Sequence, residues 1–246
     1  MTMCTRGSIL VLSTILLSLV QPALAIEDKP AIAPYNATYS ATAMGMQLQG
    51  KRSLQKTAAN EYTLSSSTSL LFNSIDDTSV FTLSKSGQLR TQDYSEIRTG
   101  FGSDKSIKQT WDWAKGTITS NYKNKDYQYA LTDTALDRVN YQLQLRLDAI
   151  KYGSNFGQRT YSIANRKSLK HNFTVDYIGE EKLSLKSGTF NTAKFKRTKD
   201  SKNSDTIWLA KDWGYLIVKI SHCEKDQCND LLLTEATIDG KKVTSL

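Results

Sequence analysis

Histidine, cysteine and proline are all scarce in this sequence. Two histidines, three cysteines and three prolines occur among 246 residues. No Gly-x-Ser-x-Gly motif accompanies His171 or His222, so the sequence offers no histidine-dependent nucleophile pair. It also lacks metal-ligand spacings, a phosphate-binding glycine loop and a dinucleotide motif. We therefore expect no cofactor and no metal, and we favour a non-enzymatic role while leaving catalysis open.

The absence of proline after Pro34 is typical of strands whose N–H groups pair with neighbours. Apolar and polar residues alternate over many short runs, including 35–43, 127–131 and 173–177, as in strands with one packed face and one wet face. Turn-forming residues between the runs fall at 85–88, 114–116, 123–126, 164–167 and 186–188. The pattern predicts a mainly β protein, with a curved antiparallel sheet or half-barrel of about ten to twelve strands.

One segment near the middle of the chain fits both a strand and a helix. Residues 139–147 place an apolar side chain at every second position, as a strand would. The same segment has an apolar stripe at helical spacing, with Asp137 as a candidate N-cap and Gly153 just past its end. We favour one helix over about 137–151, which would plug or cover the curved sheet.

The N-terminal segment has the three parts of a secretory signal peptide. Arg6 gives a basic start, residues 9–20 form an apolar run, and Ala23-Leu24-Ala25 provides a small-x-small cleavage site. The apolar run is shorter than the ~20 residues that a membrane-spanning helix needs. We expect residues 1–25 to be a signal peptide cleaved after about Ala25, which would place the mature protein in the bacterial periplasm.

The remaining chain is expected to have a flexible lead over 26–34 and a single β-rich domain over 35–246. Its 31 Lys and Arg residues outnumber 24 Asp and Glu residues, which gives a net charge of +7 once Arg6 is removed. The lysines are spread singly, except in the run 194–199. They either coat the wet face of the sheet or meet anionic lipid or glycan. Nucleic acid is not expected as a partner of an exported protein.

No apolar run after the signal segment is long enough to predict a membrane span. We therefore expect the mature protein to be soluble.

Two cysteines remain after the signal segment, which contains Cys4. Four residues separate Cys223 from Cys228, a spacing that suits the tip of a β-hairpin. An even number of cysteines in an exported chain predicts a disulfide. A Cys-x-x-Cys redox motif has two intervening residues, and a metal site would need more ligands than the neighbouring His222. We therefore predict a structural Cys223–Cys228 disulfide.

Adjacent carboxylates occur at Asp76-Asp77 and at Glu180-Glu181. Neighbours on a strand point to opposite faces, so neither pair forms a shared acid–base site by itself. A glycosidase-type mechanism needs two carboxylates that face each other across ~5–10 Å. We favour solvated turn or edge charges, and keep Asp137 and Glu181 as the carboxylates of an alternative hydrolase.

Aromatic residues form the most suggestive pattern in the sequence. Trp111 and Trp113 share one face of a predicted strand, and Tyr127 and Tyr129 share one face of another. These side chains either pack in the core, where large aromatics dominate, or line an apolar groove for a lipid tail or a partner's strand. Under the second interpretation, these four residues are the candidate ligand-binding residues.

Several short stretches, taken in order, resemble the family of exported bacterial proteins known as domain of unknown function 3108. The stretches are 111–116, 136–138, 177–181, 187–190, 207–212 and 215–218. The resemblance runs from about Tyr35 to the C-terminus and implies an exported protein with a largely antiparallel β architecture. It implies no catalytic residue. Ile217 stands where the family usually has proline, and the Cys223/Cys228 pair looks like a local addition.

These observations lead to one functional hypothesis and two alternatives. The leading hypothesis is a periplasmic binding or envelope-maintenance module that holds an apolar or amphipathic ligand, or a segment of an envelope protein. The first alternative is an envelope glycan or ester hydrolase that uses paired carboxylates. The second is a structural interaction protein that binds its partner through a strand edge.

Overall fold

The computed structural model describes residues 1, 32–43, 46–100, 105–200, 202–225 and 227–245. Apart from Met1, the expected signal peptide lies outside the described residues, and so does most of the expected lead over 26–34. The remainder, Ala31–Leu246, is one compact unit. All structural statements below concern the described part of this unit.

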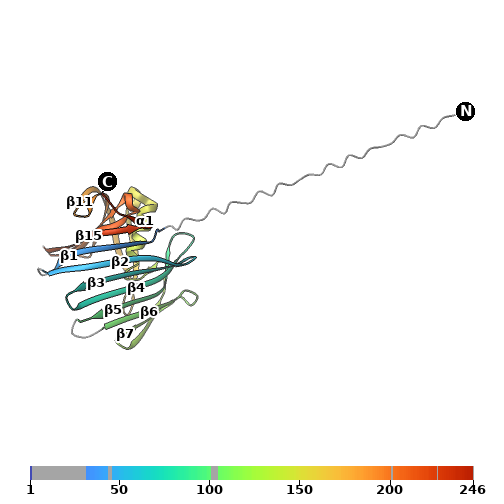
Figure 1. Ribbon diagram of the computed structural model, residues 1–246. Coiled ribbons are helices and arrows are strands. Elements are labelled where there is room, and N and C mark those ends of the chain that lie inside the picture. Colours follow the sequence, from blue (N-terminus) through green and yellow to red (C-terminus); the bar gives the residue numbers. More distant parts are fainter. Residues whose placement is uncertain (2–31, 44–45, 101–104, 201, 226, 246) are drawn as a thin grey trace. The chain divides into compact units, whose positions relative to one another are not determined.

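Sixteen strands of this unit join in one sheet (Figure 1). In chain order they are β1 (Tyr35–Ala43), β2 (Met46–Ala58), β3 (Glu61–Leu70), β4 (Asn73–Leu83), β5 (Leu89–Thr99), β6 (Lys105–Asp112), β7 (Thr117–Tyr122), β8 (Lys125–Ala130), β9 (Ala135–Leu136), β10 (Gln158–Ala164), β11 (Leu169–Leu185), β12 (Gly188–Thr198), β13 (Asn203–Ala210), β14 (Leu216–Glu224), β15 (Gln227–Ile238) and β16 (Lys241–Lys242). Across the sheet the order is β8-β7-β6-β5-β4-β3-β2-β1-β15-β14-β13-β12-β11-β10-β9, with β16 beside β15. The ladders are antiparallel apart from the short β9–β10 pairing.

The predicted mainly β class, with one curved sheet and one helix, is confirmed, but the predicted ten to twelve strands are too few. Two features of the sheet left no mark in the sequence pattern. The segment Ser65-Ser66-Ser67 has no apolar alternation, yet it lies inside β3, where ladder hydrogen bonds on both sides hold it. The strands β9 and β16 have two residues each, which is too short for any periodic signal.

The two edge strands of the sheet are consecutive in the chain. β8 and β9 lie at opposite ends of the strand order, although residues 131–134 alone connect them. No ladder joins them within the described residues, so the sheet is open. Side chains cross between the two sides instead: Tyr129 Oη donates to the Asn165 carbonyl at 2.7 Å and Ser120 Oγ donates to the Arg166 carbonyl at 2.9 Å. The sheet is therefore strongly curved.

The predicted helix exists, but it begins later than expected. Helix α1 spans Tyr141–Tyr152, with Asn140 at its N-cap and Gly153 at its C-cap. Asp137 does not cap the helix. Its carboxylate accepts hydrogen bonds from the N–H groups of Val139 and Asn140 at 2.9 and 2.8 Å, which closes a turn before the first helical residue.

Helix α1 lies against the inner face of the sheet, behind the strands at the front of Figure 1. Leu143, Leu145, Leu147 and Ala149 are all buried in the main core, so the helix is covered on several sides. Gln144 Oε1 accepts a hydrogen bond from the backbone N–H of Leu89 at 2.9 Å. The buried apolar side chains and this polar contact fix the helix inside the curve of the sheet.

The connections between strands lie at two ends of the sheet because neighbouring strands alternate in direction. One end carries the connections at 43–46, 70–73, 99–105, 122–125, 164–169, 198–203 and 224–227. The described residues of these seven ranges include eight Lys and Arg residues and two Asp and Glu residues, so we call this end the basic end. The opposite end, with connections 58–61, 83–89, 112–117, 185–188, 210–216 and 238–241, has five and four.

Candidate functional site

The predicted aromatic residues lie on the inner face of the sheet, near the two edges. Trp111 is 5% exposed and stacks on Trp113 with ring centroids 6.2 Å apart. Together with Tyr129 they pack in a small core cluster that includes residues of β9 and the end of β10. Tyr127 lies outside this cluster, half-buried beside the Lys167 ammonium. The structure thus brings three of the four residues together as packing between the sheet edges, and their role in ligand binding stays a prediction.

The predicted disulfide is present between Cys223 and Cys228. The two residues are direct cross-strand partners next to the turn between β14 and β15. This turn belongs to the basic end, and His222 precedes the disulfide directly in the sequence.

The carboxylates considered for a hydrolase lie apart from one another. Asp137 is fully buried on the inner side of the sheet, where it binds Ser79 of β4. Glu181 accepts hydrogen bonds from Lys194 Nζ and from the indole N–H of Trp208. Phe195, which follows Lys194 on β12, and Ile207, which precedes Trp208 on β13, pack in the main core. Glu181 therefore lies on the outer face, so the two carboxylates do not face each other across a cleft.

A pocket of about 350 Å³ opens at the basic end, on the inner side of the sheet. We call it the basic pocket, and its lining residues are Arg138, Tyr141, Ile163, Ala164, Asn165, Lys170, Phe173, Arg197, Lys199 and Asp205. Four of these side chains are cationic and one is a carboxylate. They come from the turn before α1, the helix itself and four strands or their connections, so only the folded chain assembles the pocket.

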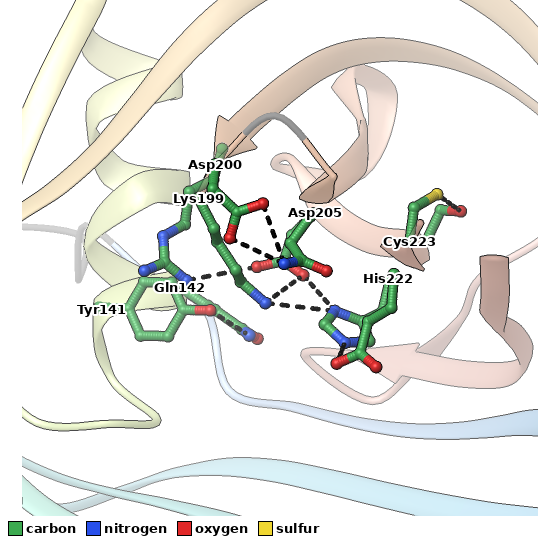
Figure 2. A network of polar contacts seen from close by, with 11 residues as sticks. Tyr141, Gln142, Lys199, Asp200, Asp205, His222 and Cys223 are labelled. Carbon is green, nitrogen blue, oxygen red and sulfur yellow. Dashed lines mark hydrogen bonds and ion pairs between the residues drawn. The ribbon is translucent and has the colours of Figure 1, made fainter. Parts of the chain in front are cut away.

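Asp205 is the single carboxylate of the basic pocket, and three basic side chains share it (Figure 2). Lys199 Nζ lies 3.0 Å and His222 Nδ1 lies 2.5 Å from Asp205 Oδ1, while Arg197 Nη1 lies 3.4 Å from Oδ2. Lys199 and Arg197 carry two positive charges against the one negative charge of Asp205, and His222 also lies 3.2 Å from a second carboxylate, that of Glu224. A surplus of positive charge therefore remains on this side of the pocket.

Lys170 adds a further positive charge on β11. Its side chain is exposed and lines the pocket, and it forms no ion pair with any residue that the structure describes. An anion that enters the pocket can therefore gain the attraction of Lys170 without breaking an existing ion pair.

Two aromatic rings form the apolar wall of the pocket. Tyr141, the first residue of α1, packs against Phe173 with ring centroids 4.6 Å apart. The guanidinium of Arg197 lies 3.7 Å from the centre of the Phe173 ring, which holds its planar fork over the aromatic face. Burial raises the pKa of the Tyr141 hydroxyl, so this group stays protonated and can donate or accept a hydrogen bond.

Behind the pocket, Arg138 connects it to a buried acidic group. Arg138 Nη1 lies 2.6 Å from Glu96 Oε2, and Arg98 Nε lies 2.8 Å from the other oxygen of the same carboxylate. Asp77, the cross-strand partner of Glu96, accepts a hydrogen bond from Tyr94 Oη at 2.6 Å. Burial raises the pKa of Asp77. Because Arg138 and Arg98 each contact one oxygen of Glu96, neither oxygen of this carboxylate is free for acid–base chemistry.

The basic pocket combines cationic side chains with aromatic rings. Its cations and aromatic rings can hold an anion and an adjoining apolar group.

Within the described residues, no three His, Cys, Asp or Glu side chains are placed to hold a metal ion together. In the same part of the chain, no helix has the length and apolar character required to cross a membrane.

The sequence pattern singled out only part of this site. The run 194–199 was visible as a cluster of basic residues, but alternation divides it between the two faces: Lys194 points outward, whereas Arg197 and Lys199 join the pocket. Lys170 and Asp205 carried no local signal. For Arg197, strand alternation was the one available cue: it places Arg197 on the same face of β12 as the core residue Phe195, and therefore on the inner face.

Comparison with known proteins gives a family and a fold. The sequence profile of the family described as "Protein of unknown function (DUF3108)" matches residues 35–226. The crystal structure titled as a beta-barrel-like protein of domain of unknown function DUF1849, from Brucella abortus, is similar with a TM-score of 0.55 and 10% identity. The match covers 84% of this chain and 98% of that one, and at this identity it concerns the fold alone. No curated protein matches the chain.

Proposed function

This chain belongs to the DUF3108 family of proteins of unknown function, and we propose that it is a non-catalytic envelope protein whose basic pocket binds the anionic end of an amphipathic ligand. The observation that carries the proposal is the excess of cations around Asp205, together with the aromatic wall formed by Tyr141 and Phe173. The volume, about 350 Å³, lies within the ~300–1,000 Å³ range of small-molecule pockets.

The charges of the pocket determine which ligands it favours. A carboxylate or phosphate group would meet Lys170, which lacks an ion-pair partner in the described chain, and the Arg197 guanidinium. Hydrogen bonds between charged groups are about twice as strong as neutral ones, and a guanidinium can bind such a group in bidentate fashion. The apolar part of the ligand would then lie against Phe173 and Tyr141, where it is shielded from water.

The alternatives have less support. The hydrolase would need two facing carboxylates, whereas Asp137 and Glu181 lie on opposite faces of the sheet. The strand-edge interaction protein would use β8, whose six residues include Lys125, and lysine at an edge disfavours pairing with another chain.

A pair of probes with the same tail and opposite charge tests the proposal. Isothermal titration with decanoate and with decyltrimethylammonium separates the contribution of the anionic group from that of the tail. We expect decanoate to bind and the cation not to bind. Lys170→Gln and Arg197→Gln should each weaken decanoate roughly three- to tenfold, as expected for the loss of one charged contact.

Lys85→Gln is the matched control, because Lys85 is an exposed lysine in a turn of the opposite end. This variant should bind decanoate like the unchanged protein. Equal binding of the two probes, or equal affinity of the Lys170 and Lys85 variants for decanoate, would contradict the proposal. Native mass spectrometry of protein released gently from its own cell envelope would then identify the natural ligand.

A further inference from the structure

The hairpin between β3 and β4 projects two large apolar side chains into water. Leu71 is 74% exposed and Phe72 is 93% exposed. Isolated apolar residues on a surface are common, but here two adjacent ones form the tip of a single turn. Leaving such side chains in water rather than burying them forgoes roughly 1.5–3 kcal/mol each. A binding partner that covers both would recover this free energy.

The backbone of this tip lies against the end of β5 and the residue that follows it. Gly100 has a φ of 80° and lies so close that a Cβ atom there would be 2.2 Å from the Phe72 carbonyl oxygen. Ser74 Oγ and Thr99 Oγ1 form a hydrogen bond of 2.9 Å between the two strands. The close approach and the hydrogen bond hold the hairpin tip in place, so the two apolar side chains are presented on a fixed turn.

Exposed lysines lie on one side of the tip, towards β5 to β8 in the strand order. The hairpin belongs to the basic end, where, among the described residues, Lys and Arg outnumber Asp and Glu by eight to two, compared with five to four at the opposite end. Lys105, Lys123 and Lys125 are exposed in the next two connections of this end. Lysines near an anionic membrane surface contribute about 1 kcal/mol each.

From this combination we infer that the basic end docks on an anionic lipid membrane, with Leu71 and Phe72 inserted among the headgroups. A projecting tip with cations on separate turns matches a lipid surface, which is soft and needs no complementary pocket. A protein partner would instead have to supply a cavity for Phe72. The basic pocket opens at the same end, so docking would bring its mouth to the lipid surface. The inference holds whether or not the pocket has a ligand.

Vesicle co-sedimentation of the full protein tests the docking. One set of vesicles is phosphatidylcholine alone, and the other contains phosphatidylglycerol as a third of its lipid. We expect binding to the anionic vesicles only, and weaker binding as the salt concentration rises, because screening acts on the lysines. The double variant Leu71→Asn/Phe72→Ser should bind at least tenfold more weakly. Asn is chosen because Leu71 has a φ of 51°, which Asn tolerates.

Ile178→Ser is the matched control, because Ile178 is an apolar residue of β11 that is 46% exposed. It should leave vesicle binding unchanged. Insertion is measured separately with an environment-sensitive dye on Phe72→Cys, with Lys85→Cys as its counterpart at the opposite end. The emission should shift to the blue on anionic vesicles for the first site only. The inference is overturned if the tip variant binds vesicles like the unchanged protein, or if the dye at position 72 reports water throughout.

Discussion

Asp137 and Ser79, 58 residues apart in the chain, meet in the buried interior, where Ser79 Oγ lies 2.5 Å from Asp137 Oδ2. Both side chains are fully buried. Asn140 joins them by donating to Ser79 Oγ at 3.2 Å and to Thr91 Oγ1 at 2.8 Å. This network links β4 and β5 to the turn that precedes α1, and it therefore determines where the helix begins.

The network predicts a specific dependence of stability on pH. Burial raises the pKa of Asp137 from 3.8 to about 6, so the folded protein holds this proton more tightly than the unfolded chain does. The resulting stabilisation is fully present below pH ~4 and is lost as the pH rises towards ~6, a change of roughly 3 kcal/mol in the free energy of unfolding. Asp137→Asn cannot ionise, so urea denaturation between these pH values should show this fall in the unchanged protein only. Parallel pH profiles of the two proteins would contradict the assignment.

Arg146 is a buried cation without a carboxylate partner among the described residues. It is 4% exposed, its Nη2 donates to the Gly214 carbonyl at 3.0 Å, and its guanidinium lies 4.8 Å from the centre of the Tyr35 ring. Its Nε and Nη1 atoms have no hydrogen-bond partner, and burial lowers its pKa. We expect Arg146→Met to be as stable as the unchanged protein or up to about 2 kcal/mol more stable, because Met keeps the packing and removes the desolvated charge.

Arg146→Ala is the companion variant, since it removes the packing as well as the charge. It should lower the free energy of unfolding by about 2–5 kcal/mol through the cavity that it leaves. Urea midpoints of both variants provide the test. A loss in the Met variant as large as in the Ala variant would show that the guanidinium is stabilising, which buried water around Nε and Nη1 would explain.

Reduction of the Cys223–Cys228 disulfide should lower stability only modestly. The cysteines are five positions apart, so the bond closes a short loop and restricts the unfolded chain by about 2 kcal/mol in the loop-entropy treatment. The hairpin ladder continues on the far side of the disulfide, from Ser221 paired with Asp230 to Lys219 paired with Leu232, and should keep its register. Denaturation with and without dithiothreitol measures the difference. A loss of more than 4 kcal/mol would mean that the disulfide organises more than this hairpin.

Trp111 separates the core interpretation of the aromatic residues from the ligand interpretation. If Trp111 packs the junction between the sheet edges, Trp111→Ala should lower the free energy of unfolding by about 3–5 kcal/mol. Decanoate affinity, measured where the variant is still folded, should not change, because Trp111 does not line the basic pocket. A weakened affinity with unchanged stability would favour the ligand interpretation.

Local sequence patterns determined the elements that rest on local physics. Alternation over 35–43 predicts a one-sided strand because strand side chains alternate between faces, and β1 occupies that range. Each of the five predicted turns covers a connection between two consecutive strands, although residues 125–126, 164 and 188 belong to the flanking strands. Glycine and polar residues favour the backbone angles that a reversal needs. The cysteine spacing likewise predicts a disulfide that four intervening residues can close without help from the rest of the chain.

The tertiary structure alone decided the number of strands, the first residue of α1 and the composition of the basic pocket. Each depends on contacts between residues distant in the chain, such as Ser79 with Asp137, or Lys170 with Arg197 around one cavity. The strand order places β8 and β9 at opposite edges of the sheet, and the curvature of the sheet brings these edges close together. The register of each ladder decides which face of the sheet a charged side chain occupies. Register and curvature are collective properties of sixteen strands, so no short stretch of sequence specifies them.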